Sequence, residues 1–300
     1  MKNIILYIMG YKGLTCLQSV IENHNAKFIV AVISAQDKTV QNDYYNEISE
    51  LCKKNDIQFY DRNDNHSIYF DIALAISWKW IIPIPNEKQL IVFHDSILPR
   101  YRGFAPLVGC LINGESKIGV TALFATDEYD KGDIIAQSVI SIDYPIKIGD
   151  AIEKITSCYI ELLNKIIDSI KSGEKIISYP QNESNATYSL WLDEKDYLIR
   201  WNKSASEIKR FIDSVGYPYK GALSFISGQK VRILESSEFI DIKIENRISG
   251  KIIFLKDNHP IVVCGKGLLK IEKIIDAATK QDLFPLKYFR TRFEESPWNI

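Results

Sequence analysis

Short apolar runs alternate with helical periodicity along the first half of the chain, and this alternation limits the possible folds more than any other feature. Apolar residues recur every three or four positions between several of the runs, as at Leu14, Leu17 and Val20 and again at Tyr45, Ile48 and Leu51. Strands that alternate with helices form a parallel sheet with crossover helices. We therefore predict an open α/β sheet whose strands cover residues 3–9, 28–34, 57–60, 72–77 and 90–94. Two further strands, 119–125 and 134–142, are expected to be joined by a turn.

The chain changes character after residue 173. A long helix is predicted from an N-cap at Asp150, and Gly173 is expected to end it. The polar stretch 180–187 has little to bury and reads as a connection. The later runs are short and separated by turn residues, which is typical of a small barrel or open sheet. Because 300 residues exceed what one hydrophobic core usually serves, we predict two domains, 1–184 and a smaller, mainly β domain 185–300.

Charge and apolar run length exclude several classes of protein. The formal net charge is −1, from 37 Lys and Arg against 38 Asp and Glu, which argues against a nucleic-acid partner. The apolar runs stop far short of the roughly 20 residues that cross a bilayer, and no secretory signal is evident, so we expect no membrane association and a cytoplasmic location. The five cysteines are odd in number and lack C-x-x-C spacing. Reduced thiols are expected, with neither disulfides nor a metal site.

His94 is the histidine most suited to chemistry. It ends the apolar run 89–93, and the carboxyl ends of parallel strands are where open α/β sheets bind ligands. The other three histidines lie in polar or turn segments. Asp127, Asp130 and Asp133 offer carboxylates that such a histidine could use, although turn residues of this kind are common without a catalytic role. A buried histidine beside a basic loop is the competing interpretation of His94.

Several separated motifs resemble those of one enzyme family. FHDSILPRYRG at 93–103, ING at 112–114, GVT at 119–121, DKGDI at 130–134 and Gln137 are similar to the Rossmann-like formyltransferase domain that uses N10-formyltetrahydrofolate. In the second half, YSLWLDEKDY at 188–197, YPYKGA at 217–222 and RTRF at 290–293 resemble the nucleotide-sugar N-formyltransferases. That resemblance implies formyl transfer from N10-formyltetrahydrofolate to the amine of a nucleotide-linked amino sugar, with a dTDP-linked dideoxy sugar for surface polysaccharide as the expected substrate.

The resemblance also implies site residues. Members of the family pair an Asn two positions before the histidine with the histidine and an aspartate, which carries over to His94 and Asp130. Val92 stands where the Asn would be. Valine cannot donate a hydrogen bond to the oxygen that becomes negative, and losing such a donor typically costs about 100- to 1,000-fold in rate. A protonated His94, a backbone N–H or an ordered water must replace it, or the chain is slow or inactive.

Binding residues follow from the same resemblance. The folate is expected to lie against Trp78, Lys79, Trp80, Ser96, Ile97, Leu98 and Pro99. The substrate is expected to contact Lys79, Tyr101, Arg102, Tyr217, Tyr219 and Phe293. Within this set, Lys79, Arg102 and nearby Arg100 are candidates for the diphosphate, and the rings of the second domain could stack on the base. Packing in the core is the alternative interpretation of the tryptophans and of the three rings of the second domain. A solvated surface position is the alternative for the arginines.

Two alternatives to the sugar substrate remain open. Methionyl-tRNA formyltransferase would have the same fold, but the segment 36–43 carries one Lys where a tRNA-binding insertion should be basic. A non-catalytic relic that still binds nucleotide sugar or folate is the other, and Val92 is the feature that supports it. By the same resemblance, a homodimer is expected.

Overall fold

The fold is described from a computed structural model, over residues 2–83, 85, 88–286 and 290–296. The chain forms two compact units. Unit 1 comprises Met1–Cys110, Ser116–Ile142 and Asp150–Trp191, and unit 2 comprises Leu111–Glu115, Asp143–Gly149 and Leu192–Ile300. The chain passes into unit 2 for the last time after Trp191, later than the predicted boundary at 184. The reason is that β9 (Tyr188–Ser189) pairs in parallel with β6 (Arg102–Gly103) of unit 1.

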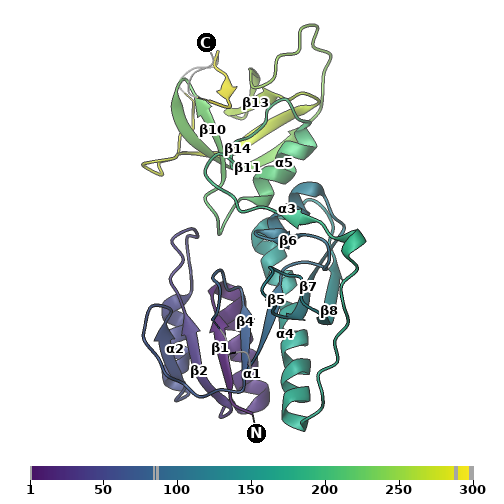
Figure 1. Ribbon diagram of the computed structural model, residues 1–300. Helices are drawn as coiled ribbons and strands as arrows, with labels where there is room; N and C mark the ends of the chain where they lie inside the picture. The colour runs from purple at the N-terminus through teal and green to yellow at the C-terminus, as the bar shows by residue number, and fades with distance from the viewer. Residues whose placement is uncertain (1, 84, 86–87, 287–289, 297–300) are drawn as a thin grey trace. The chain divides into compact units, whose positions relative to one another are not determined.

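Unit 1 is built on an open sheet. Within the described residues its strands lie in the order β3-β2-β1-β4-β5-β7-β8, and Figure 1 shows most of them side by side. The first five of these in the order are parallel, as predicted, whereas β7 runs antiparallel to both β5 and β8. The mixed sheet confirms the α/β fold class. The strands cover Ile4–Ile8 (β1), Ile29–Ser34 (β2), Gln58–Asp61 (β3), Ile72–Ile76 (β4), Gln89–His94 (β5), Lys117–Phe124 (β7) and Ile134–Ser141 (β8).

The central strands β1 and β4 are fully buried. All five residues of β1 and all five of β4 are buried, which fits their continuous apolar sequences. The helices are α1 (Gly10–His24), α2 (Tyr45–Lys54), α3 (Pro106–Asn113) and α4 (Ile148–Ser172).

Two of these helices differ from the prediction. Helix α4 begins at Ile148, so Asp150 lies in its first turn and not at the N-cap, where its charge still suits the helix dipole. Its apolar stripe is buried, from Ile155 to Ile170. The sequence analysis missed α3, although Pro106 at its first position and Gly114 just beyond its end, with φ of 74°, are the usual signals of a short helix.

Unit 2 is mainly β, as predicted. Within the described residues its sheet has the order β12-β13-β14-β11-β10-β15 with antiparallel pairing. Ser204 and Glu207 form a capping box that starts α5 (Ala205–Ser214). Strands β10 and β15 were not predicted. The strands cover Ala222–Ile226 (β10), Gln229–Phe239 (β11), Ile252–Lys256 (β12), His259–Val263 (β13), Leu268–Asp276 (β14) and Phe293–Glu294 (β15).

The five cysteines are all buried thiols, in agreement with the sequence analysis. Over the described part of the chain, none of the helices is both long enough and apolar enough to span a membrane. The same residues contain no cluster of three His, Cys, Asp or Glu side chains that could hold a metal ion.

Candidate active site

His94 lies at the carboxyl end of β5, in the middle of the unit 1 sheet, where it pairs with Thr121 of β7. The imidazole is 8% exposed. Its Nε2 is 2.8 Å from the carbonyl oxygen of Tyr101, and its Nδ1 is 3.4 Å from Oδ1 of Asp130. A carbonyl oxygen only accepts, so Nε2 holds a proton, and Nδ1 faces the carboxyl group. The structure thus brings together the two residues that were predicted to be catalytic.

Asp130 is held in a tight turn between β7 and β8. Its backbone has φ of 55°, in the left-handed region, and its Oδ2 accepts a 2.7 Å hydrogen bond from the N–H of Gly103. One carboxyl oxygen is therefore fixed while the other faces His94. Asp127 and Asp133, the other two aspartates of the segment, are exposed. The structure selects Asp130 from the three.

Gln181 secures this turn, and the sequence analysis missed it. Its side-chain Nε2 donates to the carbonyl oxygens of Asp130 and Gly132, at 2.7 and 2.8 Å. Its Oε1 accepts from Nε and Nη2 of Arg102, at 3.1 and 2.7 Å. The residue lies in the stretch that read as a connection, 51 positions from Asp130, so no local pattern indicates its role.

Arg102 is fully buried, and its guanidinium binds other side chains of the protein. Besides Gln181, its guanidinium binds both carboxylate oxygens of Glu183, at 2.9 and 2.6 Å. A bidentate arginine–carboxylate pair of this kind fixes geometry well. A substrate diphosphate could reach this guanidinium only by displacing Glu183. The contact between Arg102 and a phosphate therefore stays a prediction, and it requires Glu183 to move. The substrate contact of Tyr101 also stays a prediction, and the backbone carbonyl of Tyr101 already binds His94.

The Ser96–Pro99 turn is braced by its neighbours on β7 and β8. Thr121 Oγ1 accepts from the N–H of Leu98 at 3.1 Å and donates to the carbonyl of Ser96 at 2.7 Å. Gln137 Nε2 donates to the carbonyl of Leu98 at 2.8 Å. The Leu98 side chain is buried, and the peptide bond to Pro99 is cis. Leu98 therefore shapes the turn, and any folate contact at this residue would have to compete for backbone groups that are already bonded.

Ile97 lies close to β7 at a glycine. A Cβ on Gly119 would be 2.9 Å from Cγ1 of Ile97 and 2.6 Å from the carbonyl oxygen of Ser138. Only glycine lets the turn pack this tightly on the strand. This explains in physical terms why the GVT motif accompanies the SILP motif.

The predicted aromatic wall is present in unit 1. Trp78 packs edge-on against Tyr7 and against Trp80, with ring centroids 5.2 and 5.3 Å apart, and the guanidinium carbon of Arg62 is 4.2 Å from the Trp80 ring centroid. Both tryptophans are half-buried, and Trp78 also contacts the core around β1. Core packing and an exposed ring edge coexist here. Folate binding by the wall stays a prediction.

Lys79 is engaged by the segment after β2. Its ammonium group pairs with Asp37 and lies 3.1 Å from Oγ1 of Thr39. Burial alone would raise the pKa of Asp37, but the hydrogen bonds from Lys79 and Thr39 lower it below its usual value. Lys79 is half-exposed and remains a predicted ligand contact.

A second charged group lies beside His94 and was not predicted. Asp95 pairs with Lys12 from the first turn of α1 and accepts a hydrogen bond from the Tyr159 hydroxyl of α4. Burial would raise the pKa of Asp95, but the charge of Lys12 and the two hydrogen bonds lower it below its usual value. The same burial and the neighbouring carboxylate raise the pKa of Tyr159 well above 10. This ion pair ties three elements together directly behind the histidine.

Replacing Lys12 by Met should destabilise the fold by about 1–3 kcal/mol, because Asp95 would lose its cation in a largely buried position. The pKa of Asp95 is lower in the folded chain than in the unfolded one, so its contribution is present above the unfolded pKa of about 4 and is lost as pH falls through the folded value. Urea unfolding between pH 3 and 7 measures both effects. The double variant Lys12→Met/Asp95→Asn should regain part of the loss, and an unchanged single variant would contradict this role.

Gly132 should tolerate no side chain. A Cβ built there would lie 1.7 Å from the carbonyl oxygen of Phe124, so the turn that carries Asp130 would have to open. We expect Gly132→Ala to lower the free energy of unfolding by more than about 3 kcal/mol. Gly173→Ala is the comparison, since its Cβ would meet nothing within 4 Å, although its φ of 76° still strains alanine. Thermal unfolding should rank Gly132→Ala as clearly the worse of the two.

The aromatic residues predicted to bind the base lie in unit 2. Tyr217 is exposed and Tyr219 is half-buried, so both stay predictions. Phe293 is 1% exposed and packs against Trp201, with ring centroids 5.1 Å apart. Base stacking by Phe293 is therefore corrected to core packing, because neither face of the ring is open.

An open α/β sheet with a histidine–carboxylate pair at the carboxyl end of a central strand is the architecture of a catalytic domain. Residues 70–163 match the formyl transferase family, and residues 192–289 match the formyl transferase C-terminal domain. The chain is 30% identical to a methionyl-tRNA formyltransferase of Syntrophomonas wolfei over 215 residues, which are 70% of this chain and 68% of that protein. The chain belongs to the formyl transferase family.

Solved structures share the fold. The sugar 3N-formyl transferase WlaRD, solved in the presence of dTDP and 5-N-formyl-THF, matches with a TM-score of 0.68 at 20% identity. That match covers 91% of this chain and 97% of the WlaRD chain. HypX from Aquifex aeolicus, in complex with tetrahydrofolic acid, has a TM-score of 0.64 at 17% identity. That match covers 94% of this chain but only 45% of HypX. At these identities the likeness concerns the fold.

Proposed function

We propose that this chain transfers a formyl group from N10-formyltetrahydrofolate to the amino group of a nucleotide-linked amino-dideoxy sugar, with dTDP as the expected nucleotide and surface polysaccharide as the destination. The observation that carries the proposal is the His94–Asp130 pair, fixed at the carboxyl end of β5 by Tyr101 and Gly103. Family membership supplies the type of reaction.

The reaction requires one bond to form and one to break. The amine nitrogen bonds to the formyl carbon, the bond from that carbon to N10 breaks, the amine loses a proton and N10 gains one. Asp130 Oδ1 and His94 Nδ1 are suited to move this proton, because the pair faces each other with the other carboxyl oxygen fixed. Negative charge builds on the formyl oxygen, and Val92 cannot donate to it, so another group must take that role.

The residues near the tryptophan wall fit a folate. The indole Nε1 of Trp78 is buried and has no hydrogen-bond partner among the described residues. A pterin ring offers acceptor atoms that such a donor could satisfy, and the half-buried rings of Trp78 and Trp80 offer an apolar surface for it. Bound there, the folate would supply the formyl group, while the protein supplies its position.

A sugar nucleotide suits the surface charge of unit 1 better than a tRNA. In the segment 36–43, the carboxylate of Asp43 binds the N–H of Asp37, and Asp37 in turn neutralises Lys79. An RNA backbone needs unneutralised cations, whereas a diphosphate needs only a few. Methionyl-tRNA is the second candidate, because the Syntrophomonas wolfei relative carries that activity in its name.

The test is a direct search for product. The full chain is incubated with N10-formyltetrahydrofolate and a panel of dTDP- and UDP-linked amino sugars, and separately with methionyl-tRNA, and mass spectrometry follows the gain of one formyl group. We expect product with a dTDP-linked amino sugar. Product with methionyl-tRNA alone would replace the proposal by the second candidate. Binding of folate or nucleotide without product anywhere would identify a relic in which Val92 marks the lost function.

A further inference from the structure

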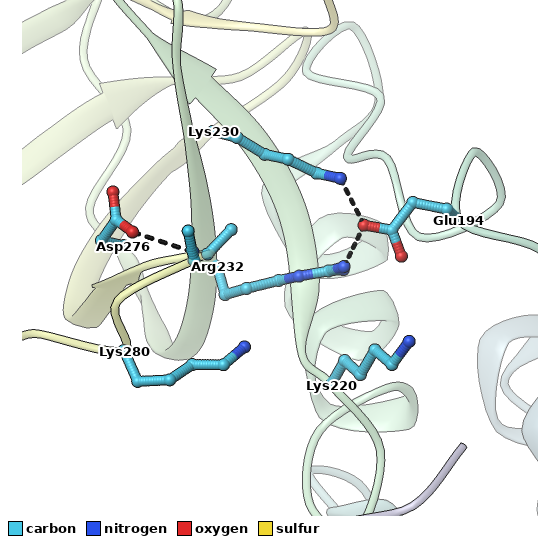
Figure 2. Close-up of a pocket in the computed structure, with 8 residues that line it drawn as sticks. Glu194, Lys220, Lys230, Arg232, Asp276 and Lys280 are labelled. Carbon is cyan, nitrogen blue, oxygen red and sulfur yellow. Dashed lines mark hydrogen bonds and ion pairs between the residues drawn. The ribbon is translucent and has the colours of Figure 1, made fainter. Parts of the chain in front are cut away.

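A cationic pocket is lined by residues of unit 2 alone. Its volume is about 520 Å³, which is within the usual range for small-molecule sites. Among the described residues, four cationic side chains and two carboxylates line it, and Figure 2 labels them. The pocket is lined by Glu194, Lys220, Lys230, Arg232, Asp276, Ala277, Ala278 and Lys280.

Arg232 forms the fixed wall of the pocket. It is 3% exposed, and its Nη1 donates to the carbonyl of Gly221 at 2.9 Å while its Nη2 binds Glu194. Lys230 binds the same carboxylate oxygen at 2.6 Å. Burial would raise the pKa of Glu194, but the hydrogen bonds from the two cations lower it below its usual value. One carboxylate thus serves two cations, which leaves positive charge at this wall.

Asp276 is committed to its own turn. Its Oδ1 accepts from the N–H groups of Ala278 and Thr279, and its Oδ2 accepts from Gln229 at 2.7 Å. These hydrogen bonds, that of the Thr279 N–H first, lower the pKa of Asp276 to about 2. Asp276 shapes the turn that carries Lys280 and forms no ion pair with that lysine, and its single charge leaves the lining, with four cations against two carboxylates, net positive.

Lys220 and Lys280 supply positive charge that a ligand could reach. Both are exposed at the pocket, from the segment before β10 and the turn after β14, and the described residues offer neither of them a side-chain partner. In Figure 2 no dashed line reaches either ammonium group. Two unneutralised cations beside a buried guanidinium favour an anion with several oxygens, since such an anion can accept from all three.

We propose that this pocket binds the phosphate groups of a small polyphosphate, such as a diphosphate, through residues of unit 2 alone. Among the described residues the lining holds no aromatic ring, so no base is stacked and the recognition rests on the phosphates. Inorganic pyrophosphate and nucleoside diphosphates with different bases should therefore bind alike at this pocket.

The test is a calorimetric titration of the full chain with inorganic pyrophosphate. The double variant Lys220→Gln/Lys280→Gln should raise the Kd for pyrophosphate at this pocket at least about tenfold, because two charge-assisted contacts are lost. Lys256→Gln is the matched control, since Lys256 is an exposed lysine of unit 2 outside the pocket. It should leave the affinity unchanged.

Three results would overturn the proposal. The first is equal binding by the wild type and the double variant, and the second is an equal loss in the Lys256→Gln control, which would indicate a general charge effect. The third is binding of an RNA oligonucleotide that depends on Lys220 and Lys280 while pyrophosphate does not bind. The titration uses no formyl donor, so its failure leaves the proposed formyl transfer untouched, and failure of formyl transfer leaves the titration intact.

Discussion

Replacing His94 by Asn should lower kcat for formyl transfer by about 100- to 10,000-fold, the usual range for a positioned proton-transfer group. Asparagine is too short to reach the Tyr101 carbonyl as Nε2 does, and its amide can neither take up nor release a proton opposite Asp130. KM for both substrates should stay within a few-fold, because the change removes an interaction made in the transition state. Steady-state kinetics on the substrate identified by mass spectrometry measures both constants.

His66→Asn is the matched control for this variant. His66 is half-buried in unit 1, where its ring contacts Tyr60, and it lies outside the candidate site. It should keep wild-type kcat. Turnover of His94→Asn within a few-fold of wild type would show that the imidazole is only a satisfied strand-end residue, the competing interpretation from the sequence. Asp130→Asn should lower kcat as well, and non-additivity of the two changes would show that the residues act as one unit.

The second large effect is expected at Gln181, which touches no reacting atom and acts through Asp130. Gln181→Leu removes the two N–H donors to the Asp130 and Gly132 carbonyls and leaves the Arg102 donors without their Oε1 acceptor. A displacement of about 1 Å in a catalytic group can cost about 100-fold in rate. We expect kcat to fall by about that factor, with KM for the folate and the sugar nearly unchanged.

A split between kcat and KM distinguishes positioning from general destabilisation. Gln181→Glu keeps an acceptor for Arg102 but loses both donors, so it should restore stability more than turnover. Asn182→Ala, which removes a side chain that only caps the short turn at Ser184, is the control and should keep wild-type kcat. Loss of stability with unchanged kcat in Gln181→Leu would contradict the positioning role.

The sequence predicted the parts of unit 1 whose patterns are local. The spacing of apolar residues predicted the strands β1 to β5 and the helices α1 and α2. The position of His94 at the end of a predicted strand indicated its role. The antiparallel direction of β7 depends on pairing between β5 and β7, which a periodic pattern does not encode. The short helix α3 was missed even though Pro106 and Gly114 mark its ends.

The supports of the site were beyond local prediction because each partner is distant in the chain. Arg102 looked like a free cation in a basic loop, and its burial depends on Gln181 and Glu183, 79 and 81 positions away. Lys12 had no predicted role, and its partner Asp95 lies 83 positions later. Base stacking by Phe293 was predicted wrongly for the same reason, because the Trp201 ring that packs against it lies on another segment.

The pairing of β6 with β9 bears on when the catalytic geometry can exist. Residues 70–163 contain His94, Asp130 and the turn between them, yet the N–H of Tyr101 is held by Thr187, and that of Phe104 by Ser189. Gln181 also comes after this segment. During synthesis, His94 and Asp130 are made long before Gln181, Thr187 and Ser189, so these three supports are in place only after Ser189 has left the ribosome. A fragment that stops at residue 163 would carry the two proposed catalytic side chains without these supports.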